Sequence, residues 1–186
     1  MHILIIVVIC LFLLVVAFFG YHLTVGFKRA LRSNSYESQA YTEANKATID
    51  QIPALNEECI RTFREKLNVV LTYDDPEKMA QILDDAVRSD KLVEAFAKPE
   101  FPWYFVLPMG AFVGELMRHN STGEWTDSGD YGPTLTIKRH VDNTKPDEIA
   151  SLSAYPLNKI VKQRAGGDPG DLYAYVMMGL SSSIDR

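Results

Sequence analysis

The residues best suited to chemistry lie close together between positions 115 and 125 of the 186-residue chain. Glu115 and His119 are four positions apart, so on a helix both side chains reach the same side. Two ligands at this spacing can begin a metal site, which His140 or Asp130 could complete, because zinc takes three or four ligands. The chain has no H-E-x-x-H motif and no paired cysteines. We therefore expect neither a metal ion nor another cofactor.

The same segment offers a polar cluster that suits contact with a protein partner. Its members combine charge with an indole ring: Glu115, Arg118, His119, Glu124 and Trp125. Aromatic side chains often anchor protein interfaces. The alternative is a structural role, in which Glu115 binds Arg118 or His119 at the surface. We therefore predict a partner-binding or structural cluster and no catalytic residues.

Other patterns typical of catalysis are absent or incomplete. Cys59 lies on the apolar face of a predicted helix and is expected to be buried and inert. The sequence has no G-x-S-x-G elbow. The glycine-bearing turns at 128–133 and 165–171 lack the lysine and hydroxyl of a phosphate-binding loop, which predicts turns and helix caps. An enzyme is the less favoured interpretation, and its concrete form is a metal-dependent enzyme using Glu115 and His119.

The first 27 residues predict a membrane anchor. They contain no Asp, Glu, Lys or Arg, and residues Ile3 to Phe19 form an unbroken apolar run of 17. A helix needs about 20 mostly apolar residues to span a bilayer. The segment lacks the basic start and the small-residue cleavage site of a signal peptide. We therefore expect an uncleaved single span over 1–27.

Basic residues predict the orientation of this span and a possible lipid contact. Because positive charges follow the span, the domain is expected on the cytoplasmic side of the inner membrane, with a periplasmic domain as the alternative. The basic residues that could meet the membrane surface are Lys28, Arg29, Arg32, Lys159 and Lys162. An ordinary solvated surface is the other interpretation. No block of like charge points to nucleic acid.

Beyond the anchor, residues 28–50 are polar and are predicted to form a juxtamembrane tether that runs into a helix. Residues 51–186 then form one domain, which is long enough for a single core. Helical spacing gives its first helix an apolar face. The residues of that face are Leu55, Cys59, Phe63, Leu67 and Val70.

A second helix is predicted to begin after Asp75, a suitable N-cap, with Pro76 at its first position. Its core-facing residues recur at helical spacing. They are Met79, Ile82, Leu83, Ala86 and Val87. A shorter helix is expected over 90–98.

The apolar stretch at 101–120 is predicted to be a core helix and not a second span, because Glu115 would be costly to bury in lipid. Beyond Pro108 its apolar residues again follow helical spacing: Met109, Phe112, Val113, Leu116 and Met117. Gly110 and Gly114 lie one turn apart on a second face. Since each glycine costs a helix about 1 kcal/mol, we expect another segment to pack closely against that face.

The remainder predicts a small antiparallel sheet followed by two helices. One strand is expected around Trp125, a turn at 128–133, and a third strand over 147–155. The middle strand is marked by alternating apolar residues: Leu135, Ile137 and Val141. The two helices begin at Pro156 and after Asp168. The order of elements predicts an α+β domain with about five helices and about three strands.

Several pieces of this half resemble an uncharacterised bacterial domain of unknown function. The matching pieces are "GAFVGELMR", "EW", "YGPTL", "YPLNKIVK" and "DLYAYVM". In that family a G-x-[FY]-x-G-E helix precedes a tryptophan, a G-P strand and a helix begun by proline. The resemblance covers about residues 101–180 and implies the same small α+β unit, without implying an activity.

Together these features predict a membrane-anchored, non-enzymatic protein-binding module. Its concrete form is an immunity-type inhibitor of a toxin, because small anchored acidic domains without catalytic residues suit stoichiometric binding. The alternative is an accessory or scaffold subunit of a bacterial membrane or envelope complex, in which the anchor makes specific contacts.

Overall fold

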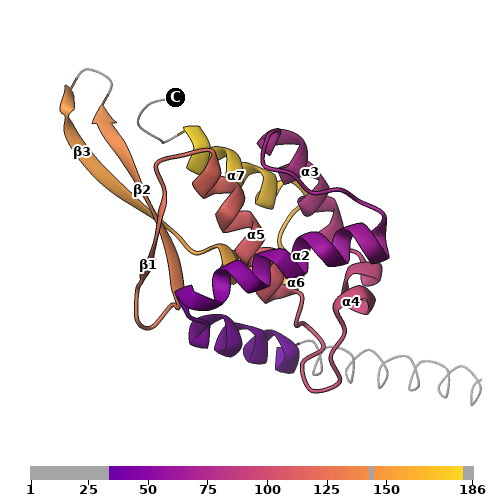
Figure 1. Ribbon diagram of the computed structural model, residues 1–186. Helices are drawn as coiled ribbons and strands as arrows, with labels where there is room; N and C mark the ends of the chain where they lie inside the picture. The colour runs from indigo at the N-terminus through magenta and orange to yellow at the C-terminus, as the bar shows by residue number, and fades with distance from the viewer. Residues whose placement is uncertain (1–33, 143–144, 182–186) are drawn as a thin grey trace, which may run out of the picture. The chain divides into compact units, whose positions relative to one another are not determined.

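The computed structural model describes residues 34–142 and 145–181. The anchor predicted over 1–27 lies outside these residues, as do the three basic residues after it, Lys28, Arg29 and Arg32. No helix among the described residues is long and apolar enough to cross a membrane. The chain divides into two units, Met1–Tyr36 and Glu37–Arg186, and the second contains the labelled elements of Figure 1.

The second unit is an α+β domain, as predicted. In chain order its elements are η1 (Ile49–Gln51), α2 (Ile52–Leu67), α3 (Pro76–Val87), α4 (Asp90–Phe96), α5 (Val106–His119), β1 (Glu124–Asp127), β2 (Pro133–Asp142), β3 (Lys145–Ala154), α6 (Pro156–Gly166) and α7 (Asp171–Ser181). A further helix covers 34–46. The described residues therefore hold more helices than the five expected, and the three expected strands.

Helix α5 is the core of the domain, and α2, α6 and α7 pack around it (Figure 1). All five of its predicted core residues are buried: Met109, Phe112, Val113, Leu116 and Met117. The helix begins at Val106, two residues before Pro108. Proline is tolerated there because the amides of the first turn have no partner within the helix.

The two glycines of α5 permit close packing, as predicted. A Cβ atom on Gly110 would lie 2.6 Å from the Cα atom of Leu157, at the start of α6. A Cβ atom on Gly114 would overlap the indole ring of Trp125. The backbone of Leu157 and the indole of Trp125 therefore lie closer to α5 than a side chain at Gly110 or Gly114 would allow.

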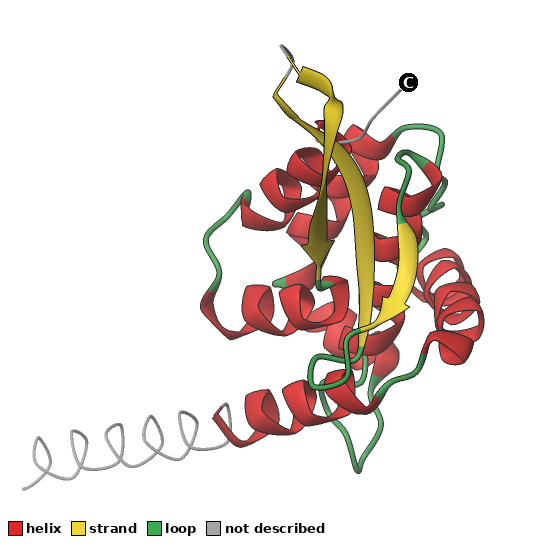
Figure 2. Cartoon of the chain, turned by 90° about the vertical axis from the view of Figure 1, so that its left-hand side faces the viewer, coloured by secondary structure: helices red, strands yellow, loops and turns green. Residues whose placement is uncertain are grey.

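The sheet has the order β1-β2-β3 and is antiparallel throughout. Trp125 pairs with Leu135, which in turn pairs with Ala154. Leu135 and Ile137 are fully buried, which confirms the predicted alternation at these two positions. Figure 2 shows the helices behind one face of the sheet, while the other face is turned to the viewer and uncovered. The side chain of Val141 lies outside the described part of the chain.

Two predicted helix faces need correction. Val70 is 61% exposed, because α2 ends at Leu67 and Asn68 takes a left-handed conformation with φ of 55°. In α3 the N-cap Asp75 and Pro76 stand as predicted. The buried face of α3, however, differs from the predicted one by two additional residues and by two that are less buried than expected. Ala80 and Asp84 are buried, whereas Ile82 and Ala86 are only partly covered.

Within the segment 28–50, which was predicted to be a tether that runs into a helix, residues 34–46 form a helix. Ala40 and Ala44 on this helix are fully buried. The amide of Gln39 donates a 2.9 Å hydrogen bond to the carbonyl of Glu100. The small residues of this segment therefore serve helix packing, and the compact unit begins at Glu37.

Candidate functional site

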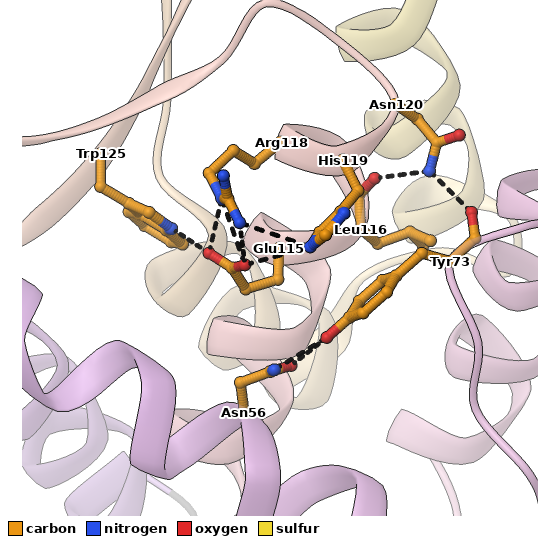
Figure 3. A network of polar contacts seen from close by, with 8 residues as sticks. All are labelled: Asn56, Tyr73, Glu115, Leu116, Arg118, His119, Asn120 and Trp125. Atoms are coloured by element: carbon orange, nitrogen blue, oxygen red, sulfur yellow. Dashed lines mark hydrogen bonds and ion pairs between the residues drawn. The ribbon is translucent and has the colours of Figure 1, made fainter.

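The centre of the candidate site is the Glu115 carboxylate near the end of α5 (Figure 3). The Arg118 guanidinium binds it in a fork, with Nε 3.0 Å and 3.1 Å from its two oxygens and Nη2 2.8 Å from Oε2. The indole Nε1 of Trp125 donates a 2.7 Å hydrogen bond to Oε1. One carboxylate therefore holds a cation and an aromatic ring in fixed positions.

Local structure explains this arrangement. Arg118 follows Glu115 by three residues on the same helix, which places the two side chains side by side. Trp125 comes from β1, and its ring lies over Gly114 because no side chain there blocks it. The carboxylate side chain is 12% exposed, whereas that of Arg118 is 41% exposed. Glu115 is thus largely covered by the two groups that it holds.

The surroundings act on the pKa of Glu115 in both directions. Burial raises it, but hydrogen bonds from Arg118 and Trp125, with the charges of Arg118 and His119, bring the pKa below its ordinary value. The hydrogen bond with Glu115 in turn raises the pKa of Arg118. At neutral pH the carboxylate is therefore ionised and provides the negative charge that binds Arg118.

His119 belongs to the cluster through stacking. Its ring lies parallel to that of Tyr73, with ring centres 4.2 Å apart, and Tyr73 also stacks on Phe112. The His119 Nε2 atom is 3.7 Å from Glu115 and 3.3 Å from the Arg118 guanidinium. The ring is therefore held by an aromatic contact on one side and polar contacts on the other.

Three residues that sequence analysis missed complete the network (Figure 3). Asn56 exchanges hydrogen bonds of 2.8 Å and 3.1 Å with the Tyr73 hydroxyl. Asn120 donates to the backbone carbonyls of Tyr73 and Leu116, at 2.9 Å and 3.0 Å. No local sequence signal marks Asn56 or Tyr73, because both meet the cluster only through the tertiary fold.

An open pocket of about 450 Å³ adjoins this cluster. Its walls come from η1, the start of α2, the end of α5 and β1. The lining residues are Ile49, Ile52, Pro53, Asn56, Glu57, Glu115, Arg118 and Trp125. The pocket therefore has an apolar side beside the fixed guanidinium and indole.

The remaining predicted residues lie apart from this cluster. Glu124 precedes Trp125 in β1, so its side chain points to the opposite face of the sheet and is exposed. Lys162 is exposed on α6. Lys159 is half-buried, with its Nζ atom 5.6 Å from the ring centre of Tyr175, and burial lowers its pKa. Of the two lysines predicted to face the membrane surface, Lys162 is therefore more exposed than Lys159.

The structure also shows where the residues considered for other chemistries lie. Cys59 is fully buried, and burial raises the pKa of its thiol well above the ordinary value. Among the described residues, no group of three histidine, cysteine, aspartate or glutamate side chains could hold a metal ion. Asp130 is exposed in the turn before β2, and the side chain of His140 lies outside the described part.

Asp84, a fully buried carboxylate on α3, was not predicted from the sequence as a polar centre. The backbone amides of Gly170 and Leu172, at the start of α7, donate to it at 2.8 Å and 3.0 Å. The Gln163 amide and the Arg88 guanidinium donate at 3.3 Å and 2.8 Å. At the end of the glycine-bearing turn 165–171, backbone amides therefore bind the Asp84 carboxylate of the same protein.

The turn at 165–171 is thus a helix cap, in the role expected for it, with its anion supplied by another helix.

The resemblance to a domain of unknown function stays a prediction. No protein-family model, curated protein or solved structure matches this chain.

Proposed function

We propose that this chain is a non-enzymatic protein-binding module, and that Arg118 and Trp125 anchor its partner. The observation that carries the proposal is that Glu115 fixes both side chains at the rim of an open pocket. The apolar run from Ile3 to Phe19 supports attachment to the inner membrane. The concrete form of the proposal is an immunity-type inhibitor that neutralises a toxin stoichiometrically.

The state of Glu115 favours binding over catalysis. Both of its oxygens accept hydrogen bonds, and its lowered pKa keeps it ionised at neutral pH. A general base needs a pKa near the operating pH and an oxygen within reach of the proton that it takes. Glu115 is better suited to positioning its two neighbours.

Arg118 and Trp125 are residue types that are common at protein interfaces. Tryptophan and arginine are enriched among residues whose loss most weakens binding. Side chains that are already fixed lose less conformational entropy when a partner binds. The adjoining apolar side, made by Ile49, Ile52 and Pro53, can accept an apolar side chain from the partner.

The test is affinity capture of the full-length protein from gently solubilised membranes, followed by quantitative mass spectrometry. We expect one stoichiometric partner, whose recovery falls about tenfold or more in Arg118→Ala. Arg61→Ala is the matched control, because Arg61 is exposed on α2 and does not line this pocket. Equal recovery with both variants would contradict the proposal. A set of membrane-complex subunits would instead favour an accessory subunit.

A further inference from the structure

A second hollow lies between the start of α3 and α7. It consists of two adjoining pockets, of about 420 Å³ and about 450 Å³, which share Asp75 and Glu77. The Glu77 carboxylate accepts a 3.0 Å hydrogen bond from the Tyr173 hydroxyl. This bond joins the two helices, and we call the shared hollow the α3–α7 groove.

The lining of the α3–α7 groove includes apolar side chains. Ile82 lines one pocket, and Met177 and Leu180 line the other. Ile82 and Met177 are half-buried, so each leaves part of its side chain accessible. Methionine adapts readily to the shape of a partner because its side chain is flexible and polarizable.

The rim of the groove is acidic. Asp74, Asp75 and Glu77 are all exposed, and Lys78 is the single cation among the described residues that line it. One oxygen of Asp75 caps α3 by accepting from the Lys78 amide at 3.0 Å. No described residue forms an ion pair with any of the three carboxylates. Their charge is therefore available to a partner.

The groove is continuous along the chain with the Glu115 cluster. Tyr73 stacks on His119 in that cluster, and the next two residues, Asp74 and Asp75, line the groove. The Asn120 amide donates a 2.9 Å hydrogen bond to the Tyr73 carbonyl, which fixes the backbone just before Asp74. The cluster and the groove are therefore joined by one short backbone segment.

We infer that the α3–α7 groove binds a basic, amphipathic segment of the protein partner. An apolar side chain of that segment would lie against Met177 and Leu180, and its lysine or arginine would meet Asp74 and Glu77. Charge complementarity selects this occupant, because an acidic segment would be repelled by the rim. The inference rests on the proposed function, since it names the chemistry of the same partner.

The experiment uses the full-length protein in uncharged detergent micelles, with ¹³C-labelled methionine methyl groups. The probe is the tripeptide acetyl-Lys-Leu-Lys-amide, with acetyl-Glu-Leu-Glu-amide as its acidic counterpart. We expect the Met177 methyl resonance to shift progressively with the basic peptide only. The Met109 methyl, which is fully buried in α5, should not move.

Variants then locate the binding. The double variant Asp74→Asn, Glu77→Gln keeps the side-chain shapes and should weaken binding of the basic peptide about fivefold. Asp85→Asn should bind as the wild type does, because Asp85 is exposed on α3 but does not line the groove. Equal binding by the double variant, an equal response to the acidic peptide, or an unmoved Met177 methyl would each overturn the inference.

This assay needs no natural partner, so its result is independent of the capture experiment on Arg118. If the groove fails to bind the basic peptide while Arg118→Ala still loses a partner, the inference is wrong and the proposed function stands. If the peptide binds but Arg118→Ala keeps its partner, the groove stands and the proposed site does not.

Discussion

Asp84 on α3 and Glu115 on α5 are both acidic residues followed within about one helical turn by an arginine. The distance from carboxylate oxygen to guanidinium nitrogen is 2.8 Å in each pair. The Asp84 side chain is only 1% exposed, whereas that of Glu115 is 12% exposed and its arginine 41% exposed. The same local pattern thus lies inside the domain at Asp84 and at its surface at Glu115.

The other donors to each carboxylate explain the difference. Asp84 accepts from the backbone amides of Gly170 and Leu172, so it ties α3 to the start of α7. Glu115 accepts from the Trp125 indole, so it positions a side chain at a pocket. An acid-arginine pair on a helix therefore does not reveal its role until the remaining donors are known.

The largest expected effect comes from Asp84→Ala in the full-length protein. Removing one member of a buried charge pair costs about 3–5 kcal/mol of unfolding free energy, and two backbone amides also lose their acceptor. Urea denaturation in detergent, followed by tryptophan fluorescence, measures this loss. Asp85→Ala is the control, since its side chain is 69% exposed, and it should change the unfolding free energy by less than about 0.5 kcal/mol. If Asp84→Ala lost as little unfolding free energy as Asp85→Ala, Asp84 would not have the structural role that separates it from Glu115.

Glu115→Ala should have an intermediate effect. Leaving the partly buried donors of Arg118 and Trp125 without their acceptor is expected to cost about 1–3 kcal/mol. Glu115→Gln keeps an oxygen for the indole and should recover part of that loss. The same denaturation experiment measures both variants, and an alanine variant as stable as the wild type would show that the carboxylate does not hold its neighbours.

The pH dependence of Glu115 has a defined sign. Because its pKa is lower in the folded protein than in the unfolded chain, its contribution is full above the unfolded pKa and is lost as pH falls through the folded pKa. The stability difference between wild type and Glu115→Gln should therefore shrink between about pH 5 and about pH 3. Denaturation curves of both proteins across this range provide the measurement. A difference that grows on acidification would mean that the pKa is raised.

The smallest effect on stability is expected for Arg118→Ala. Without Arg118 the Glu115 carboxylate keeps its hydrogen bond from Trp125, and an ion pair whose guanidinium is 41% exposed contributes only about 0.2–1 kcal/mol. The variant should therefore unfold almost as the wild type does while losing its partner in the capture experiment. A loss above about 2 kcal/mol would indicate that Arg118 is a structural residue, as Arg88 is, since measured losses of that size reflect buried networks.

The Glu115 cluster could be predicted from the sequence because its residues lie close together along the chain. Glu115, Arg118 and His119 share one side of a helix whose apolar face repeats regularly, and that repeat also predicted the core position of α5. The close approach at Gly110 and Gly114 was predicted for the same reason. The identity of the segments that approach, Leu157 and Trp125, required the fold.

Asp84 was missed because most of its partners are distant in sequence, at Gln163, Gly170 and Leu172. One signal was present in the sequence. Ala80, Asp84 and Val87 recur at helical spacing, which places the carboxylate on the buried side of α3. A charged residue in that position needs donors, and the turn before α7 supplies them.

The most direct test of the central claim, that the pocket beside Arg118 and Trp125 contacts a protein partner, is photo-crosslinking in cells. A photoreactive residue at Glu57, which is exposed and lines the pocket, is compared with one at Lys91, which is exposed on α4 and does not line it. We predict one discrete crosslinked adduct from position 57 and none from position 91. The same adducts from both positions, or an adduct from position 91 alone, would contradict the account.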